Sequence, residues 1–144
     1  SGKGVEQVVG LMDVMPTLLD AAGAQIPDSV DGMSVLPLMR GESIPWREYL
    51  HGEHTACYQP DDGVQYLTDG VEKYIWYTQT GVEQFFDLQN DPNEGQNLIK
   101  APDVQGRVAL WRERLIGELA NRPEGYSNGT QLIVGRKAST VLQN

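Results

Sequence analysis

Residues 64–88 read VQYLTDGVEKYIWYTQTGVEQFFDL, and this stretch decides the fold. Its central part, residues 71–78, is rich in aromatic and β-branched residues, which is typical of a strand. Asp69-Gly70 predicts a tight hairpin turn before that strand, and Gly81 predicts a second turn after it. We therefore expect three antiparallel strands, at 64–68, 71–78 and 83–88.

The sequence on either side of this stretch completes the predicted architecture. Residues 48–55 predict a further strand, which makes a four-stranded antiparallel meander. Asp103 is expected to N-cap a long helix that must end before Pro123. The apolar positions of this helix repeat at intervals of 4, 3, 4 and 4 residues: Val104, Val108, Trp111, Leu115 and Leu119. One apolar stripe of this kind predicts a helix that covers one face of the sheet.

The first 44 residues predict a strand and two short helices. Four apolar residues between Val8 and Met12 favour a buried strand. Asp13 is an N-cap candidate for a helix that ends near Gly23, and Ser34 is a cap candidate for a second helix. We expect an α+β fold in three parts: residues 1–44, residues 45–122 with the sheet and long helix, and residues 123–144 as an irregular tail with a short strand at 131–134.

Composition excludes several classes of function. The chain has 144 residues, with 11 Lys and Arg against 20 Asp and Glu, so its formal net charge is −9. This acidic balance argues against a nucleic-acid partner and against docking on anionic membranes. A single cysteine, Cys57, excludes an internal disulfide and any multi-cysteine metal site. No apolar stretch approaches the roughly 20 residues of a transmembrane helix.

The segment His51-Gly52-Glu53-His54 carries the most chemistry-bearing residues. Histidines three positions apart on a strand point to opposite faces, so they cannot share one metal ion. For these histidines, structural hydrogen bonding is favoured over contact with a substrate, and both are favoured over metal binding. Glu53 with Asp61 and Asp62 could form a carboxylate pair, but a solvated turn is the favoured interpretation of the two aspartates.

Cys57 would act as a nucleophile only with a base such as His54 beside it, and an inert thiol is favoured. The aromatic residues of the strands are expected in the core of the sheet. The residues alone therefore form no complete catalytic set.

Several segments resemble the C-terminal region of a bacterial sulfatase, arylsulfatase-like, of the alkaline phosphatase superfamily. They occur in family order across about residues 5–100: VGLMDVMPTLLDAAG (9–23), DGMSVLPL (31–38), WREYLHGE (46–53), KYI (73–75), FDLQNDPNE (86–94) and NL (97–98). The resemblance implies a four-stranded sheet on a long helix, in agreement with the pattern of the residues.

The resemblance also implies a parent enzyme that hydrolyses sulfate esters with calcium and a formylglycine made from the cysteine of a C-x-[PA]-x-R motif. Cys57-Tyr-Gln-Pro-Asp61 lacks that pattern. The chain is therefore expected to hold no catalytic residue and no metal ligand, and to be inactive as a fragment. Its implied partners are the N-terminal sulfatase domain and, in the parent, a sulfated small molecule or glycan. The family suggests a periplasmic or secreted protein.

Family resemblance places this region at the rim of the substrate cleft. His54 is the first candidate for contact with substrate, followed by His51 and Thr55. The apolar surface of residues 8–19 is expected to be exposed in the chain by itself. Two alternatives stay open: a related phosphonate or phosphate-ester hydrolase, and a non-catalytic binding module.

Overall fold

The computed structural model describes residues 4–55 and 59–137, and the chain divides into two compact units at Leu50 and His51. Each unit is described by itself. Among the described residues, no helix combines the length and the apolar character that crossing a bilayer requires.

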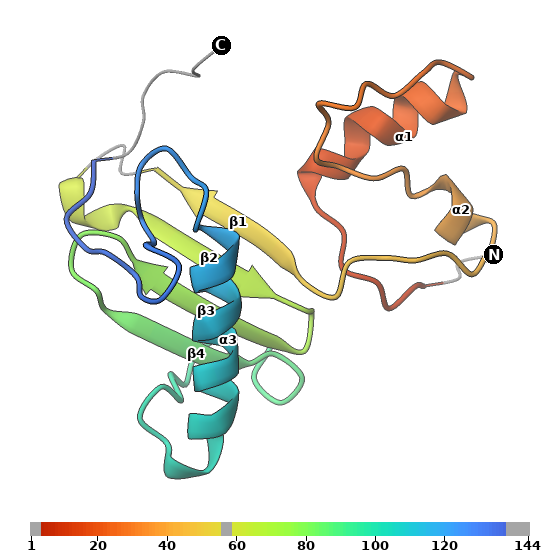
Figure 1. Cartoon of the computed structure of the whole chain (residues 1–144). Coiled ribbons are helices and arrows are strands. Elements are labelled where there is room, and N and C mark those ends of the chain that lie inside the picture. Colours follow the sequence, from red (N-terminus) through yellow and green to blue (C-terminus); the bar gives the residue numbers. More distant parts are fainter. Residues whose placement is uncertain (1–3, 56–58, 138–144) are drawn as a thin grey trace. The chain divides into compact units, whose positions relative to one another are not determined.

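The first unit contains the 3₁₀ helix η1 (Leu11–Asp13) and the α-helices α1 (Val14–Ala21) and α2 (Leu36–Met39) (Figure 1). The strand expected between Val8 and Met12 is wrong, because the chain turns there. The Asp13 N–H donates to the Gly10 carbonyl at 3.0 Å, and the Gly10 N–H donates to the Asp13 carboxylate at 2.8 Å. A turn that is closed by a side chain can carry the same apolar run as a strand, so the apolar pattern does not distinguish the two.

In this unit, α1 ends close to the predicted Gly23, and α2 begins close to the predicted Ser34. Gly23 has a φ of 69° and terminates α1, while the Ala24 N–H donates to the Leu19 carbonyl at 2.9 Å. The left-handed conformation favours glycine at this position. The Ser34 hydroxyl accepts a hydrogen bond from the Leu36 N–H at 3.3 Å, at the start of α2. Asp13 occupies the N-cap position of α1, but its carboxylate makes no capping bond.

The second unit contains the predicted four-stranded meander. Its strands are β1 (Leu50–His54), β2 (Val64–Thr68), β3 (Glu72–Tyr77) and β4 (Glu83–Asp87), in the order β1-β2-β3-β4. The β2–β3 and β3–β4 pairs are antiparallel. At the predicted hairpin, the Asp69 carboxylate accepts hydrogen bonds from the N–H groups of Val71 and Glu72, at 2.8 and 2.7 Å.

The long helix α3 (Gln105–Glu118) lies across the sheet (Figure 1) and contacts β2 and β3. All five residues of the predicted apolar stripe are at most 2% exposed. The strands contribute buried side chains to the same unit: Leu67, Tyr74, Trp76 and Phe85. Asp103 is not the N-cap, because the 3₁₀ turn η3 (Pro102–Val104) precedes the helix and places Val104 at that position.

The described part of the tail packs on the same unit. Tyr126 is 3% exposed and meets the Trp76 ring edge-to-face, with centroids 6.1 Å apart. The strand expected at 131–134 is wrong, since only a single bridge, Ser127 with Leu132, forms in that region. β-Branched residues without a partner strand beside them do not form a ladder.

Candidate functional site

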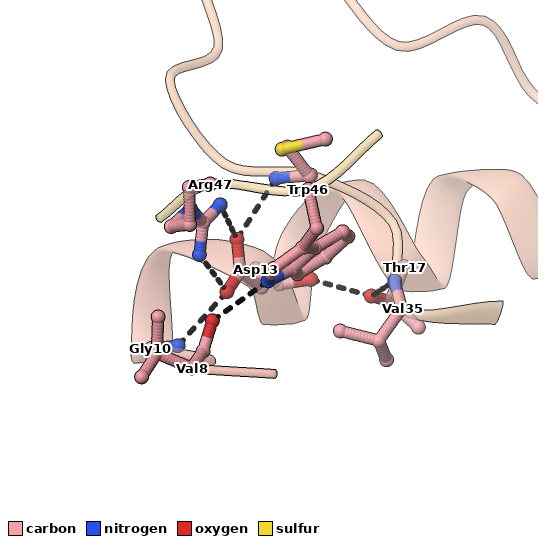
Figure 2. Close-up of polar contacts among 8 residues, drawn as sticks. Val8, Gly10, Asp13, Thr17, Val35, Trp46 and Arg47 are labelled. Carbon is pink, nitrogen blue, oxygen red and sulfur yellow. Dashed lines mark hydrogen bonds and ion pairs between the residues drawn. The ribbon is translucent and has the colours of Figure 1, made fainter. Parts of the chain in front are cut away.

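Asp13 is the centre of a buried polar cluster in the first unit (Figure 2). Its carboxylate forms a two-pronged ion pair with the Arg47 guanidinium, with both N–O distances 2.6 Å. The same oxygens accept the N–H groups of Gly10 and Met33, each at 2.8 Å. Nearby, the Trp46 indole N–H donates to the Val8 carbonyl at 2.8 Å.

The bonds around Asp13 decide its charge state. Burial by itself would raise its pKa, but the hydrogen bonds from Arg47, Met33 and Gly10 lower the pKa to about 2. The carboxylate is therefore ionised at neutral pH, and both of its oxygens are already used. An acid or base in catalysis needs an accessible proton or lone pair, so this cluster holds the first unit together instead.

A second cluster joins β1 and β2 to the chain after α3. His51 Nε2 lies 2.7 Å from Gln65 Oε1, and Gln65 Nε2 donates to Glu53 Oε2 at 3.0 Å. The Arg122 guanidinium donates to the same Glu53 oxygen at 2.7 Å and to Glu124 at 3.1 Å. We call these five residues the His51–Arg122 cluster.

Charges within this cluster shift two pKa values. Burial lowers the pKa of Arg122, but its bonds to Glu124 and Glu53 outweigh burial and raise the pKa overall. Burial raises the pKa of Glu124, but the bond from Arg122 outweighs it and lowers the pKa overall. Arg122 and Glu124 therefore stabilise each other's charged forms.

Strand alternation separates the predicted site residues. His51 and Glu53 lie on one face of β1, where they meet Gln65, whereas Gly52 and His54 lie on the other face. Tyr66 covers Gly52 so closely that an added Cβ would lie 2.2 Å from Tyr66 Cζ and 2.3 Å from its hydroxyl oxygen. His54 and Thr55 are exposed, and His51 is half-buried. The structure therefore brings His51 and Glu53 together and leaves His54 apart from them.

Among the described residues, Asp61 and Asp62 join neither cluster. Asp61 and Asp62 are exposed in the 3₁₀ turn η2 (Pro60–Asp62), as the solvated-turn interpretation expected. Cys57 lies outside the described residues.

Three members of the His51–Arg122 cluster were not predicted from the sequence: Gln65, Arg122 and Glu124. Gln65 stands inside a strand that is otherwise mostly apolar, and an amide at such a position needs buried partners. Arg122 is 69 residues away from Glu53, so no local pattern links them.

The chain does not fit the calcium and formylglycine that the resemblance implies for a parent enzyme. Within residues 4–55 and 59–137, no three His, Cys, Asp or Glu side chains are grouped so that they could hold a metal ion. The sequence around Cys57 also lacks the formylglycine motif.

Comparison with known proteins agrees with the fold. Residues 1–121 match the family described as N-sulphoglucosamine sulphohydrolase, C-terminal. An arylsulfatase of Clostridium perfringens is 42% identical over 140 residues, which cover 97% of this chain and 28% of that protein. The multifunctional alkaline phosphatase superfamily protein PehA of Trinickia caryophylli is 32% identical, covering 81% of this chain and 27% of that protein.

A solved 2-O GAG sulfatase has the same arrangement, with a TM-score of 0.69 and 26% identity. The match covers 85% of this chain and 27% of that structure. The chain thus spans less than a third of the length of the relatives it matches.

Proposed function

Because the chain belongs to the sulfatase family and corresponds to its C-terminal region, we propose that it forms the C-terminal subdomain of an enzyme that hydrolyses sulfate esters. The family match over residues 1–121 carries this proposal. The 42% identity to an arylsulfatase along 97% of the chain supports it. In such an enzyme, formylglycine and calcium would come from the N-terminal domain, and this subdomain would support that domain and contact the substrate.

An apolar surface of the first unit supports an N-terminal domain as the partner. Its members lie on or beside η1 and α1, and each is between 41 and 92% exposed: Val9, Leu11, Met12, Val14, Met15 and Leu18. Clustered apolar side chains of this kind mark an interface. We expect the chain by itself to bind a hydrophobic dye, and L11S with L18S to lower that binding. Equal dye binding by both proteins would contradict the assignment of this surface.

The exposed end of β1 is proposed as part of the substrate-cleft rim. His54 ends the strand, Thr55 follows it, and both are exposed. His51 lies on the opposite face of β1 and is half-buried. In the full-length enzyme, His54→Ala should lower kcat/KM about tenfold, as expected for the loss of one polar contact with substrate.

The control for this experiment is Gln89→Ala, at an exposed turn residue after β4. It should leave kcat/KM unchanged, and both variants should keep the Tm of the parent. An unchanged kcat/KM in His54→Ala would remove His54 from the rim.

A related phosphonate or phosphate-ester hydrolase is the second candidate. The 32% identity to a multifunctional protein of the alkaline phosphatase superfamily keeps this candidate beside the first. The two candidates are separated by the ratio of kcat/KM for 4-nitrophenyl sulfate and for a 4-nitrophenyl phosphonate ester, measured with the full-length protein. A C-x-[PA]-x-R motif in the gene upstream of Ser1 would support the sulfatase, and a Thr or Ser nucleophile would support phosphoryl chemistry.

Family membership also supports export of the parent protein to the periplasm or the medium. Fractionation of the source cells tests this proposal, which a purely cytoplasmic protein would contradict.

A further inference from the structure

Gln65 is a buried residue whose amide oxygen and amide nitrogen both have hydrogen-bond partners. The residue is 3% exposed and lies opposite Trp76 in the β2–β3 register. Its Oε1 is 2.7 Å from His51 Nε2, and its Nε2 is 3.0 Å from Glu53 Oε2. A buried amide in such a place keeps these partners, because losing them leaves its polar atoms unpaired.

Arg122 determines which way this amide faces. The Arg122 guanidinium donates to Glu53 Oε2 at 2.7 Å, and an ionised carboxylate only accepts hydrogen bonds. The Gln65 NH₂ group must therefore face Glu53, and the Gln65 carbonyl oxygen must face His51. Since a carbonyl oxygen also only accepts, His51 Nε2 must carry a hydrogen atom.

We propose that Arg122, Glu53 and Gln65 are positioning residues that hold the neutral His51 ring in its Nε2–H tautomer. The lone pair is then on Nδ1, which can accept a hydrogen bond but cannot donate one. If the chain serves at the substrate cleft, as the proposed function has it, His51 would therefore recognise a hydroxyl group of the substrate and not an oxygen of its sulfate group.

Nitrogen NMR of the histidine rings tests the proposal directly. The chain has two histidines, so ¹⁵N-histidine labelling gives two rings, and His54→Asn assigns them. Long-range ¹H–¹⁵N spectra at about pH 8.5 would be recorded, above the range in which ordinary imidazoles titrate. We expect His51 to show a protonated Nε2 and an unprotonated Nδ1. A protonated Nδ1, or averaged tautomers, would overturn the proposal.

We call the chain of hydrogen bonds from Arg122 through Glu53 and Gln65 to His51 the relay. Two substitutions test whether this relay fixes the His51 tautomer. Glu53→Gln lets residue 53 present either a donor or an acceptor, so Gln65 is free to rotate and His51 should become a mixture of tautomers. Glu124→Gln changes the other carboxylate on Arg122 and should leave the His51 spectrum unchanged. A fixed tautomer in folded Glu53→Gln would show that something else orients the ring, and would refute the relay. The wild-type spectrum tests the tautomer by itself if Glu53→Gln does not fold.

The spectra are independent of enzyme activity. If the full-length protein does not hydrolyse sulfate esters but the tautomer is Nε2–H, the proposed function fails and the relay stands. If it hydrolyses them but the tautomer differs, the relay fails and the function stands.

Discussion

Asp13→Asn should remove the central ion pair of the first unit while keeping the size of the side chain. Asp13 Oδ1 accepts from Met33 and Arg47, and Oδ2 accepts from Gly10 and Arg47. An asparagine places an NH₂ group at one of these two positions, where it faces two donors. Two hydrogen bonds are then lost, and the Arg47 side chain, 14% exposed, keeps an unpaired charge.

The expected loss of unfolding free energy in Asp13→Asn can be worked out in two ways. Removing one partner of a buried ion pair costs about 3–5 kcal/mol in other proteins. The pKa of Asp13 falls from its ordinary 3.8 to about 2, which corresponds to about 2 kcal/mol of stabilisation of the charged form. Because asparagine keeps one acceptor and Arg47 is partly solvated, we expect a decrease of about 3 kcal/mol in the unfolding free energy of the first unit.

Trp46 provides a local probe for this measurement. Its indole N–H donates to the Val8 carbonyl within the same unit, so its NMR cross-peak reports the folding of this unit. Urea titrations of both proteins, followed at this peak, give the difference in unfolding free energy. Glu42→Gln is the matched control, since Glu42 pairs with Arg40 at 3.7 Å on an exposed surface and its loss should have almost no effect. A loss under about 1 kcal/mol in Asp13→Asn would refute the reasoning.

The same ion pair predicts a pH dependence. The pKa of Asp13 is lower in the folded chain than in the unfolded chain, so its contribution is fully present above about pH 4. It is lost as the pH falls from about 4 towards 2, when the folded carboxyl takes up its proton. Over this range the first unit of the wild type should lose about 2 kcal/mol more than Asp13→Asn, and equal losses would contradict the assignment.

Three further substitutions test the packing, each by urea unfolding. Trp111→Ala should lower the free energy of unfolding by about 3–5 kcal/mol because Trp111 is 1% exposed. Leu110→Ala, at a residue 47% exposed on the same helix, should lower it far less. Similar losses in the two variants would contradict the buried stripe. Gly52→Ala should lower the free energy of unfolding by about 1–3 kcal/mol because its Cβ would lie 2.2 Å from Tyr66 Cζ and force that side chain to move, and a neutral effect would contradict that close approach. Gly32→Ala should lower the free energy of unfolding more than Gly52→Ala does, because its Cβ would meet the Met12 carbonyl oxygen, which moves only with the backbone. A larger loss in Gly52→Ala would contradict this expectation.

Local patterns were sufficient wherever a structure depends on neighbouring residues. The Asp69-Gly70 turn was predictable because the aspartate side chain bonds N–H groups two and three positions ahead of it. The stripe from Val104 to Leu119 was predictable because helical spacing places those residues on one face. The strand expected near Val8 failed, because the bonds of Asp13 close a turn there.

The candidate site also has one part that was predictable from local sequence and one part that was not. Strand alternation in the segment from His51 to His54 was enough to predict that the two histidines lie on opposite faces of β1. The partner of His51 was not predictable, because Gln65 is 14 residues away and belongs to another strand.

By itself, the sequence determined the α+β class, the four-strand meander, the buried face of the long helix and, through its ordered motifs, the likeness to sulfatases. Only the tertiary structure decided how the charged and polar side chains pair. Arg47 reaches Asp13 across 34 residues, and Arg122 reaches Glu53 across 69. Apolar burial follows a short period along the chain, whereas a hydrogen bond depends on one donor meeting one acceptor in space, and no local spacing encodes that meeting.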